Sequence, residues 1–413
     1  MRFMIVQLAL KSLANRRMSA LFTILAVALS VCLFLGVEKV RTGARASFEM
    51  TISDTDLIVG ARSSSINLLL YTVFRIGDPT GGVSWESYEQ IANAPGVAWT
   101  VPLSLGDSHR GYRVIGTTEA YLERYKYAGD QSLRLSQGGW FAEPDEVVLG
   151  AEVARALEYG LGQEIVLAHG VGAVSFAEHD NYPFRIVGIL APTGTPVDRS
   201  VHVSLEGLDA MHGLVEAHED EDEHDHSHEP QQISAFLLGM DSPVQILRIQ
   251  RQINTYPAEA LSAVIPGVAL SQLWTVIGAG ERALQAISVF VVLVGLISVL
   301  TSLSSSVNER RREMSILRAV GARPAHVFGL IVSETLILSL AGALGGFVIV
   351  HTLLMGLTGW VASQYGLSVQ LAGPGLMDVL TIAGVTIAGG VMGLLPAWRS
   401  LRLSLTDGLS IRL

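Results

Sequence analysis

The sequence predicts an α-helical membrane protein with four transmembrane helices and a large mixed α/β extracytoplasmic domain inserted between helices 1 and 2. Hydrophobic residues make up 49% of the 413 residues and charged residues only 16%, which is typical of a membrane protein with a sizeable soluble part. Four apolar runs reach the length of about 20 residues that a membrane-spanning helix needs. Between the first two runs, residues 41–272 are numerous enough to form a folded domain.

The N-terminal region is expected to form a cytoplasmic amphipathic helix over residues 1–17, followed by transmembrane helix 1 over residues 18–40. The apolar core of helix 1, Met18–Val37, contains no charged residue. A cleaved signal peptide is the alternative, helped by the small residues of Ala44–Ala46, but this core is longer than the roughly 7–15 apolar residues of a signal peptide. The residues before the core include cations and no acid, which predicts a cytoplasmic N-terminus: Arg2, Lys11, Arg16 and Arg17.

The periplasmic domain over residues 41–272 contains patterns of both helices and strands. Glu146–Leu157 predicts a strand, a glycine turn and a helix. Residues rich in β-branched side chains predict strands at Phe184–Leu190 and Val201–Ser204. A serine cap predicts a helix over Ser84–Ala92. No nucleophile pattern accompanies the scattered histidines, which we interpret as structural residues: His109, His169, His179 and His202.

An acidic, histidine-rich loop over residues 216–229 interrupts this domain. It holds eight carboxylates and four histidines, and it supplies −8 of the net charge of −10. Such dense like charge is typical of a solvated tether. The alternative is weak capture of a transition metal such as Zn²⁺, because imidazole is a good ligand and the acids attract cations. The candidate metal ligands are His218, His224, His226 and His228.

The second transmembrane helix is expected within a long helix over residues 273–308. The chain has no proline between Leu273 and Pro324, and 36 residues of helix measure about 54 Å at about 1.5 Å per residue. The bilayer core accounts for only about 30 Å of this length. The remainder is therefore predicted to form a stiff stalk outside the membrane.

A basic segment over residues 309–325 follows this helix. It contains five arginines and two glutamates between two membrane spans, which marks a cytoplasmic loop. Ile316, Leu317 and Val320 lie opposite the charges in a helical projection, so the segment is predicted to form a surface helix. Such a helix could anchor to membrane lipid or receive force from a partner protein.

Transmembrane helices 3 and 4 are expected over residues 326–355 and 379–398. A short periplasmic loop over residues 356–378 joins them, and a cytoplasmic tail over residues 399–413 follows. The tail contains three arginines and one acid, so both termini are predicted to be cytoplasmic. Glu334 is the main ionisable residue inside the spans, and it is either a functional group or an anchor near the interface.

Several classes of function are excluded by what the chain lacks. Its one cysteine, Cys32, allows no disulfide framework within the chain. None of its three lysines stands in the Gly-x-x-x-x-Gly-Lys-Ser/Thr pattern of a nucleotide-binding P-loop. We therefore expect no ATPase activity in this chain, no bound cofactor other than the weak zinc considered above, and no nucleic-acid partner.

Glu309–Ala322 carries a specific motif, which resembles Glu-Arg-Arg-x-Glu-Ile-Gly-x-Leu-Arg-Ala-x-Gly-Ala with Met-Ser in place of Ile-Gly. This is the signature of the MacB/FtsX-like permease family of ABC transporters, which includes the lipoprotein-release subunits. Four other segments are similar to family patterns: Leu8–Arg16, Glu146–Ala154, Glu334–Gly346 and Leu395–Leu403. The resemblance covers the chain essentially end to end. The acidic, histidine-rich loop is not part of the family signature.

The resemblance implies a homodimer that works with a separate ABC ATPase subunit, in which ATP is bound. It makes the basic segment the contact with that subunit. The implied ATPase-coupling residues are Glu309, Arg310, Arg311, Arg312, Glu313, Arg318, Gly321 and Ala322. A periplasmic adaptor or a lipoprotein is a further expected partner, in addition to membrane lipid.

Two functions follow from the resemblance. The chain is expected to be the permease subunit of a MacB-like transporter of the bacterial inner membrane, which moves its periplasmic domain to export or extract a substrate. The alternative is an FtsX-like relay that activates a periplasmic effector without transport. The large outer domain favours the transporter, because FtsX-type outer domains are usually smaller.

Overall fold

The structure is a computed structural model, which describes the chain except for residues 1, 170–181, 217–231, 310–320, 366–372 and 403–413. The chain forms two compact units. The helical unit comprises Met1–Gly43, Gly278–Gly359 and Leu371–Leu413, and the α/β unit consists mainly of Ala44–Ile277.

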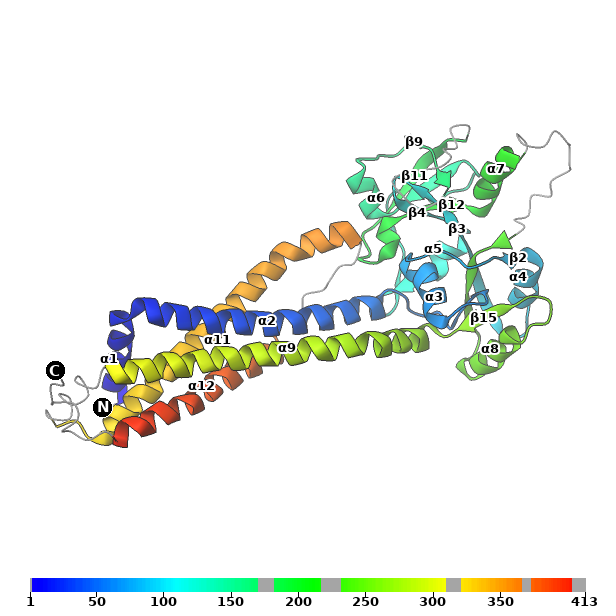
Figure 1. The fold of residues 1–413 in the computed structure, drawn as a ribbon. Coiled ribbons are helices and arrows are strands. Elements are labelled where there is room, and N and C mark those ends of the chain that lie inside the picture. The colour runs from blue at the N-terminus through cyan, green and yellow to red at the C-terminus, as the bar shows by residue number, and fades with distance from the viewer. Residues whose placement is uncertain (1, 170–181, 217–231, 310–320, 366–372, 403–413) are drawn as a thin grey trace. The chain divides into compact units, whose positions relative to one another are not determined.

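The helical unit contains four helices that are long and apolar enough to cross a membrane, as predicted (Figure 1). They are α2 (Arg17–Met50), α9 (Pro266–Glu309), α11 (Pro324–Tyr365) and α12 (Leu376–Arg402), and the shorter α1 (Arg2–Asn15) precedes them. These helices extend beyond the predicted spans. For example, α2 continues to Met50 rather than residue 40 because polar helix-forming residues follow its apolar run, and Arg45 pairs with Glu49 one turn later at 3.0 Å.

Glycines allow the spans to approach one another closely. Gly342 and Gly346 of α11 lie against Val27 and Ala28 of α2, so a Cβ at Gly342 would be 2.5 Å from Val27 Cβ. On α12, a Cβ at Gly389 would be 2.6 Å from the Cβ of Ser339 on α11. All four helices also contribute apolar side chains to one buried cluster. Close backbone approach through small residues is a main source of helix association in a bilayer.

The α/β unit is built on a mixed sheet of eleven strands. The main path is β15-β1-β14-β3-β4-β12-β8-β11-β7, while β10 pairs with β3 and β9 pairs with β11. Their bounds are β1 (Leu57–Ala61), β3 (Val97–His109), β4 (Tyr112–Thr117), β7 (Leu135–Gly138), β8 (Glu146–Leu149), β9 (Glu164–Ile165), β10 (Ala168–His169), β11 (Phe184–Leu190), β12 (Ser200–Ser204), β14 (Ala235–Met240) and β15 (Leu261–Val264).

Shorter elements complete the unit. Two ribbons pair β2 (Val83–Ser84) with β13 (Gln232–Ile233), and β5 (Lys126–Tyr127) with β6 (Gln131–Ser132). The helices and helical turns are α3 (Ser65–Leu69), η1 (Leu70–Phe74), α4 (Trp85–Ala92), α5 (Ala120–Arg124), α6 (Ala151–Ala156), η2 (Pro196–Arg199), α7 (Leu205–Glu216), η3 (Pro243–Gln245) and α8 (Ile246–Asn254).

The local predictions for this unit are confirmed. The expected strand, turn and helix are β8 and α6, and the two further predicted strands are β11 and β12. The helix predicted from a serine cap is α4, in which the Ser84 hydroxyl accepts a hydrogen bond from the Ser87 N–H at 3.3 Å. These signals are local in sequence, which is why they could be identified without the tertiary structure.

The long strand β3 joins the two halves of the sheet. Its first half pairs with β14 and its second half with β4, and the register shifts between Leu105 and Ser108. One half of the sheet packs against α4 and α8, and the other packs against α6 and α7. A register irregularity of this kind bends a strand, which allows β3 to pair with strands in both halves of the sheet.

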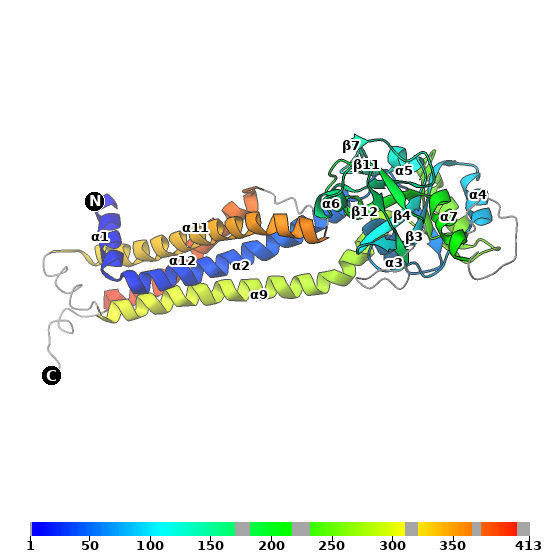
Figure 2. The same cartoon turned by 90° about the horizontal axis from the view of Figure 1, so that it is seen from above.

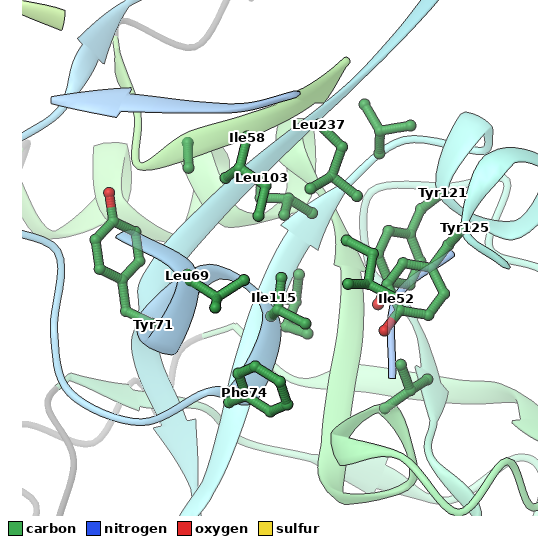
Figure 3. Packing of buried hydrophobic residues seen from close by; sticks show 14 of the residues in the cluster. Ile52, Ile58, Leu69, Tyr71, Phe74, Leu103, Ile115, Tyr121, Tyr125 and Leu237 are labelled. Carbon is green, nitrogen blue, oxygen red and sulfur yellow. The ribbon is translucent and has the colours of Figure 1, made fainter. Parts of the chain in front are cut away.

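The largest core cluster holds the ends of two long helices inside the α/β unit. Ile58, Leu103 and Tyr121 come from β1, β3 and α5 and pack together in this cluster (Figure 3). Ile52, which follows α2, and Leu270, from the first turns of α9, belong to the same cluster. The α/β core therefore fixes the C-terminal end of α2 and the N-terminal end of α9.

We predict that Gly389→Ala destabilises the protein, by about 1–3 kcal/mol, because the added methyl group would overlap Ser339 in a packed interface. Gly384→Ala is the matched control on the same helix, since a Cβ there would meet no atom within 4 Å. Thermal unfolding of the purified full-length variants in detergent would measure the difference. Equal melting temperatures for the two variants would show that α11 and α12 do not pack at Gly389.

We also predict that His202 makes the folded protein sensitive to acid. The ring is fully buried, its Nδ1–H donates to the Val148 carbonyl at 3.3 Å, and burial together with the positive charge of Arg75 lowers the pKa of His202 from 6.5 to about 3. The contribution of His202 to the free energy of unfolding is therefore fully present above pH 6.5. It decreases by about 1.4 kcal/mol per pH unit as the pH drops towards 3.

The variant His202→Gln retains a donor for the Val148 carbonyl but cannot take up a proton. Its unfolding free energy, measured by tryptophan fluorescence between pH 7 and pH 4, should fall less steeply than that of the wild type. The same slope in both proteins would mean that the folded protein protonates His202 without cost.

Candidate coupling site

One end of the helical unit gathers the helix ends that flank the basic segment. The helix α1, the end of α9, the start of α11 and the end of α12 lie together there (Figures 1 and 2). We call this the basic end, because its described residues include five cations: Lys11, Arg16, Arg17, Arg323 and Arg399. The sequence predicted this accumulation of positive charge from the flanks of the apolar runs.

Most predicted coupling residues lie outside the described residues: Arg310, Arg311, Arg312, Glu313 and Arg318. Of the others, Glu309 is the last residue of α9. Gly321 has a φ of +104°, in the left-handed region that favours glycine, and Ala322 follows it. The turn that leads into α11 therefore explains why this position of the motif is a glycine.

Hydrogen bonds and apolar packing fix the start of α11, at the end of the basic segment. The helix begins at Pro324, and the His326 N–H donates to the Arg323 carbonyl at 2.8 Å. The Arg323 N–H donates in return to His326 Nδ1 at 3.2 Å, as a capping side chain does. Val327 and Ile331 of α11 then pack against Ala397 of α12. A force applied to the segment would act on two packed helices.

Polar side chains lie buried a little further along α11. Glu334 is 2% exposed, and Thr335 and Ser339 are fully buried. Gly393 and Gly389 of α12 lie against Thr335 and Ser339, respectively. The Thr335 hydroxyl donates to the Ile331 carbonyl at 3.1 Å, so part of this polar character is satisfied within the helix. Glu334 is thus buried in the bundle rather than exposed to lipid.

Ion pairs join three helices at the opposite end of the helical unit. Lys39 of α2 contacts Asp378 of α12, with 2.9 Å between Nζ and Oδ2, and the two side chains are only 11% and 3% exposed. Asp378 Oδ2 also accepts the Gly375 N–H at 2.8 Å at the start of α12. A buried pair held by a further hydrogen bond resists separation, because either charge alone is costly in a low-dielectric site.

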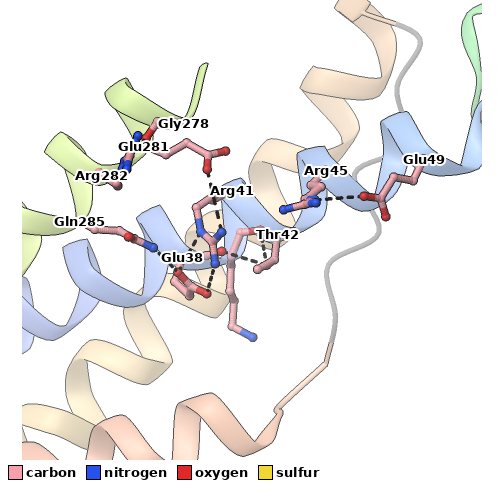
Figure 4. Close-up of polar contacts among 10 residues, drawn as sticks. Glu38, Arg41, Thr42, Arg45, Glu49, Gly278, Glu281, Arg282 and Gln285 are labelled. Carbon is pink, nitrogen blue, oxygen red and sulfur yellow. Dashed lines mark hydrogen bonds and ion pairs between the residues drawn. The ribbon is translucent and has the colours of Figure 1, made fainter. Parts of the chain in front are cut away.

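A second set of polar contacts in this network joins α2 to α9 (Figure 4). Arg41 makes two hydrogen bonds to Glu38, at 2.7 and 3.1 Å, and its other Nη atom lies 4.0 Å from Glu281 of α9. Gln285 of α9 donates to Glu38 at 3.4 Å. Sequence reasoning missed this network, although the charges that border the apolar runs were a signal for it.

The candidate zinc ligands His218, His224, His226 and His228 lie outside the described residues. In the ranges that the structure describes, no three His, Cys, Asp or Glu side chains lie close enough together to hold a metal ion.

Two of the other histidines are structural, as predicted. His109 is buried, its Nδ1–H donates to the Val166 carbonyl at 2.6 Å, and its Nε2 accepts from the Tyr159 hydroxyl at 3.0 Å. Burial is the main cause of the lowered pKa of His109. His202 is likewise buried and bonded to a carbonyl.

The curated relatives of this chain include ATP-binding/permease export proteins. The chain is 24% identical over 409 residues to the macrolide export ATP-binding/permease protein MacB of Azoarcus sp. (strain BH72), covering 96% of this chain and 57% of that protein. It is 25% identical to the pyoverdine export ATP-binding/permease protein PvdT of Pseudomonas aeruginosa, covering 79% of this chain and 47% of that protein. The chain thus spans about half the length of these curated relatives.

A crystal structure of the periplasmic region of MacB from Actinobacillus actinomycetemcomitans matches 54% of this chain and 94% of that chain, with 11% identity and a TM-score of 0.34.

Two family models match successive parts of the chain. Residues 20–256 match the MacB-like periplasmic core domain, and residues 286–405 match the FtsX-like permease C-terminal domain. The first range covers more than half of the 413 residues, and the second contains the basic segment. The chain belongs to the MacB/FtsX-like family of ABC transporter permeases.

Proposed function

We propose that this chain is the permease subunit of a MacB-like ABC transporter that couples ATP hydrolysis in a separate subunit to movement of its α/β unit. The observation that carries this proposal is the continuity of α9, one helix from Pro266 to Glu309. Its first turns belong to the α/β core, and its last residue, Glu309, is the first residue of the basic segment. A helix of 44 residues measures about 66 Å, more than twice the bilayer core of about 30 Å.

The basic segment is proposed to be the contact with the ATPase. Arg310, Arg311, Arg312 and Arg318 offer charge to a partner surface, and Glu309 and Glu313 limit the number of surfaces that fit. The fixed start of α11 at Arg323–Ile331 supports the proposal, because a displaced basic segment would move packed helices rather than a free loop. Motion would reach α9 at one end of the segment and α11 at the other.

ATP binding is assigned to the partner subunit, because the 413 residues contain no P-loop. The matched family domains support a permease role for the residues present. The family and the four apolar helices mark a multi-pass protein of the bacterial inner membrane. We propose that both termini are cytoplasmic, since the basic end would then face the cytoplasm.

A homodimer is proposed for the assembled transporter, with membrane lipid around its spans. The exported or extracted substrate would come from the periplasm or the membrane. A periplasmic adaptor or a lipoprotein would be its further partner. The relatives named for macrolide and pyoverdine export support an export role.

A second candidate is an FtsX-like relay that activates a periplasmic effector without transport. The match of residues 286–405 to the FtsX-like permease C-terminal domain supports it. The match of residues 20–256 to the MacB-like periplasmic core domain favours the transporter. Reconstitution with the ATPase in vesicles would separate them, because only a transporter moves substrate across or out of the bilayer without an added effector.

We predict that Arg311→Glu combined with Arg312→Glu uncouples ATP hydrolysis in the partner from function. The expected loss of coupled activity is about 5–150-fold, the range that corresponds to coupling free energies of about 1–3 kcal/mol. The measurement is substrate-dependent ATPase activity of the reconstituted complex, with membrane insertion and thermal stability unchanged.

Arg399→Glu is the matched control, since it reverses an arginine at the same basic end outside the segment. It should retain coupling. Normal activity after alanine replacement of Arg311, Arg312 and Glu313 together would contradict the proposed role of the segment.

We also propose that residues 216–229 bind Zn²⁺ weakly, through His218, His224, His226 and His228. The alternation of the last three histidines with Asp225 and Ser227 in an acidic loop supports the proposal. Calorimetry with Zn²⁺ should give weak binding to the full-length protein, which deletion of residues 216–229 abolishes. Equal heats for the wild type and the deletion variant would leave the loop as a solvated tether.

A further inference from the structure

A cavity of about 460 Å³ lies at one edge of the sheet in the α/β unit. It is lined by the edge strand β15, the end of α8, the segment before α3 and the first turns of α9. All of its lining residues belong to the α/β unit. Its volume lies within the range of about 300–1,000 Å³ that is usual for small-molecule sites.

The backbone groups at the centre of the edge strand β15 already have hydrogen-bond partners, so a further strand cannot pair there without breaking them. The Ala263 N–H donates to Asn254 Oδ1 at 2.7 Å, and the Ala263 carbonyl accepts from Gln250 Nε2 at 3.0 Å. Both side chains come from α8, which thus satisfies the outward backbone groups of β15. A peptide that extends the sheet would have to displace these bonds, so the cavity is better suited to a compact ligand.

The polar wall of the cavity favours an anion. Arg62 is exposed and is the one charged residue among the described residues that line the cavity, which include no acid. Its Nη2 donates to the Asn254 carbonyl at 3.1 Å, which leaves the rest of the guanidinium for a ligand. The Ser63 hydroxyl is buried and has no hydrogen-bond partner in the part of the chain that the structure describes. A positive charge next to an unpaired hydroxyl fits a carboxylate or a phosphate.

The opposite wall belongs to α9 and carries an apolar and a polar side chain, Val268 and Gln272. Val268 lines the cavity and is 50% exposed. Gln272 and Val276 follow at intervals of four residues and therefore lie along the same face of the helix. Val276 is 68% exposed, so an apolar side chain recurs on this face one turn beyond Gln272. The apolar body of a ligand could contact Val268 while its head group reaches Arg62.

We propose that this cavity binds an amphiphilic anion, with a carboxylate or phosphate head at Arg62 and Ser63 and an alkyl body along Val268. The inference goes beyond the transport function proposed above, since binding needs neither the ATPase nor the basic segment. Loss of coupling in the Arg311 and Arg312 variant would therefore leave it intact, and failure of binding here would leave the coupling proposal intact.

The test is equilibrium dialysis of radiolabelled octanoate against the full-length protein in phosphatidylcholine nanodiscs, with empty nanodiscs as the blank. Arg62→Gln should weaken binding about tenfold, which corresponds to about 1.4 kcal/mol. Arg248→Gln should bind like the wild type, because Arg248 is an exposed arginine of α8 outside the cavity lining. Val268→Ser, a second variant at an exposed site, should also weaken octanoate binding.

Competition with unlabelled compounds defines the ligand class. Octyl phosphate should displace octanoate, while octylamine and inorganic phosphate should displace it poorly. Displacement by octylamine would contradict the anionic head, and displacement by inorganic phosphate as strong as by octyl phosphate would contradict the apolar body. Binding that is unchanged in Arg62→Gln would overturn the assignment of this cavity.

Discussion

The close approach of α11 to its neighbours on two sides is the contact on which the helical unit depends. A bilayer offers no hydrophobic gain when apolar helices associate, so packing has to come from short distances between backbones. Glycines of α11 accept side chains of α2, and glycines of α12 accept Thr335 and Ser339 of α11. The buried Glu334 lies beside these contacts. The same packing that holds the spans together therefore also shields polar groups from lipid.

The two ends of the helical unit differ in how their charges are used. At the basic end, cations gather beside the basic segment, and the start of α11 is fixed by capping and by apolar packing on α12. At the opposite end, the Lys39–Asp378 pair and the contacts of Arg41 join α2 to α12 and α9. The ion pairs at this opposite end thus tie three helices of the unit together.

In the α/β unit, the ends of α2 and α9 meet in one core. Phe48 of α2 and Trp274 of α9 have ring centroids 5.6 Å apart, and Arg45 lies 5.9 Å from the Trp274 ring centroid. Displacement of either helix would disturb this core, which also contains residues of β1 and β3. The cavity beside Arg62 shares the first turns of α9 with this core. A ligand bound there would contact the same helix that leads to the basic segment.

Local physical chemistry allowed the sequence by itself to determine the four spans, the accumulation of charge at the basic end, the capped helix α4 and the strands β8, β11 and β12. Apolar length, cap residues and β-branched runs act over a few neighbouring residues, so they can be recognised without knowledge of the fold. The family signature at Glu309–Ala322 is equally local. Only the tertiary structure decided that Lys39 meets Asp378, that Gly389 faces Ser339, and that Arg62 shares a cavity with Val268. Those pairings depend on helix rotation and strand register, which are set by packing between residues far apart in the chain.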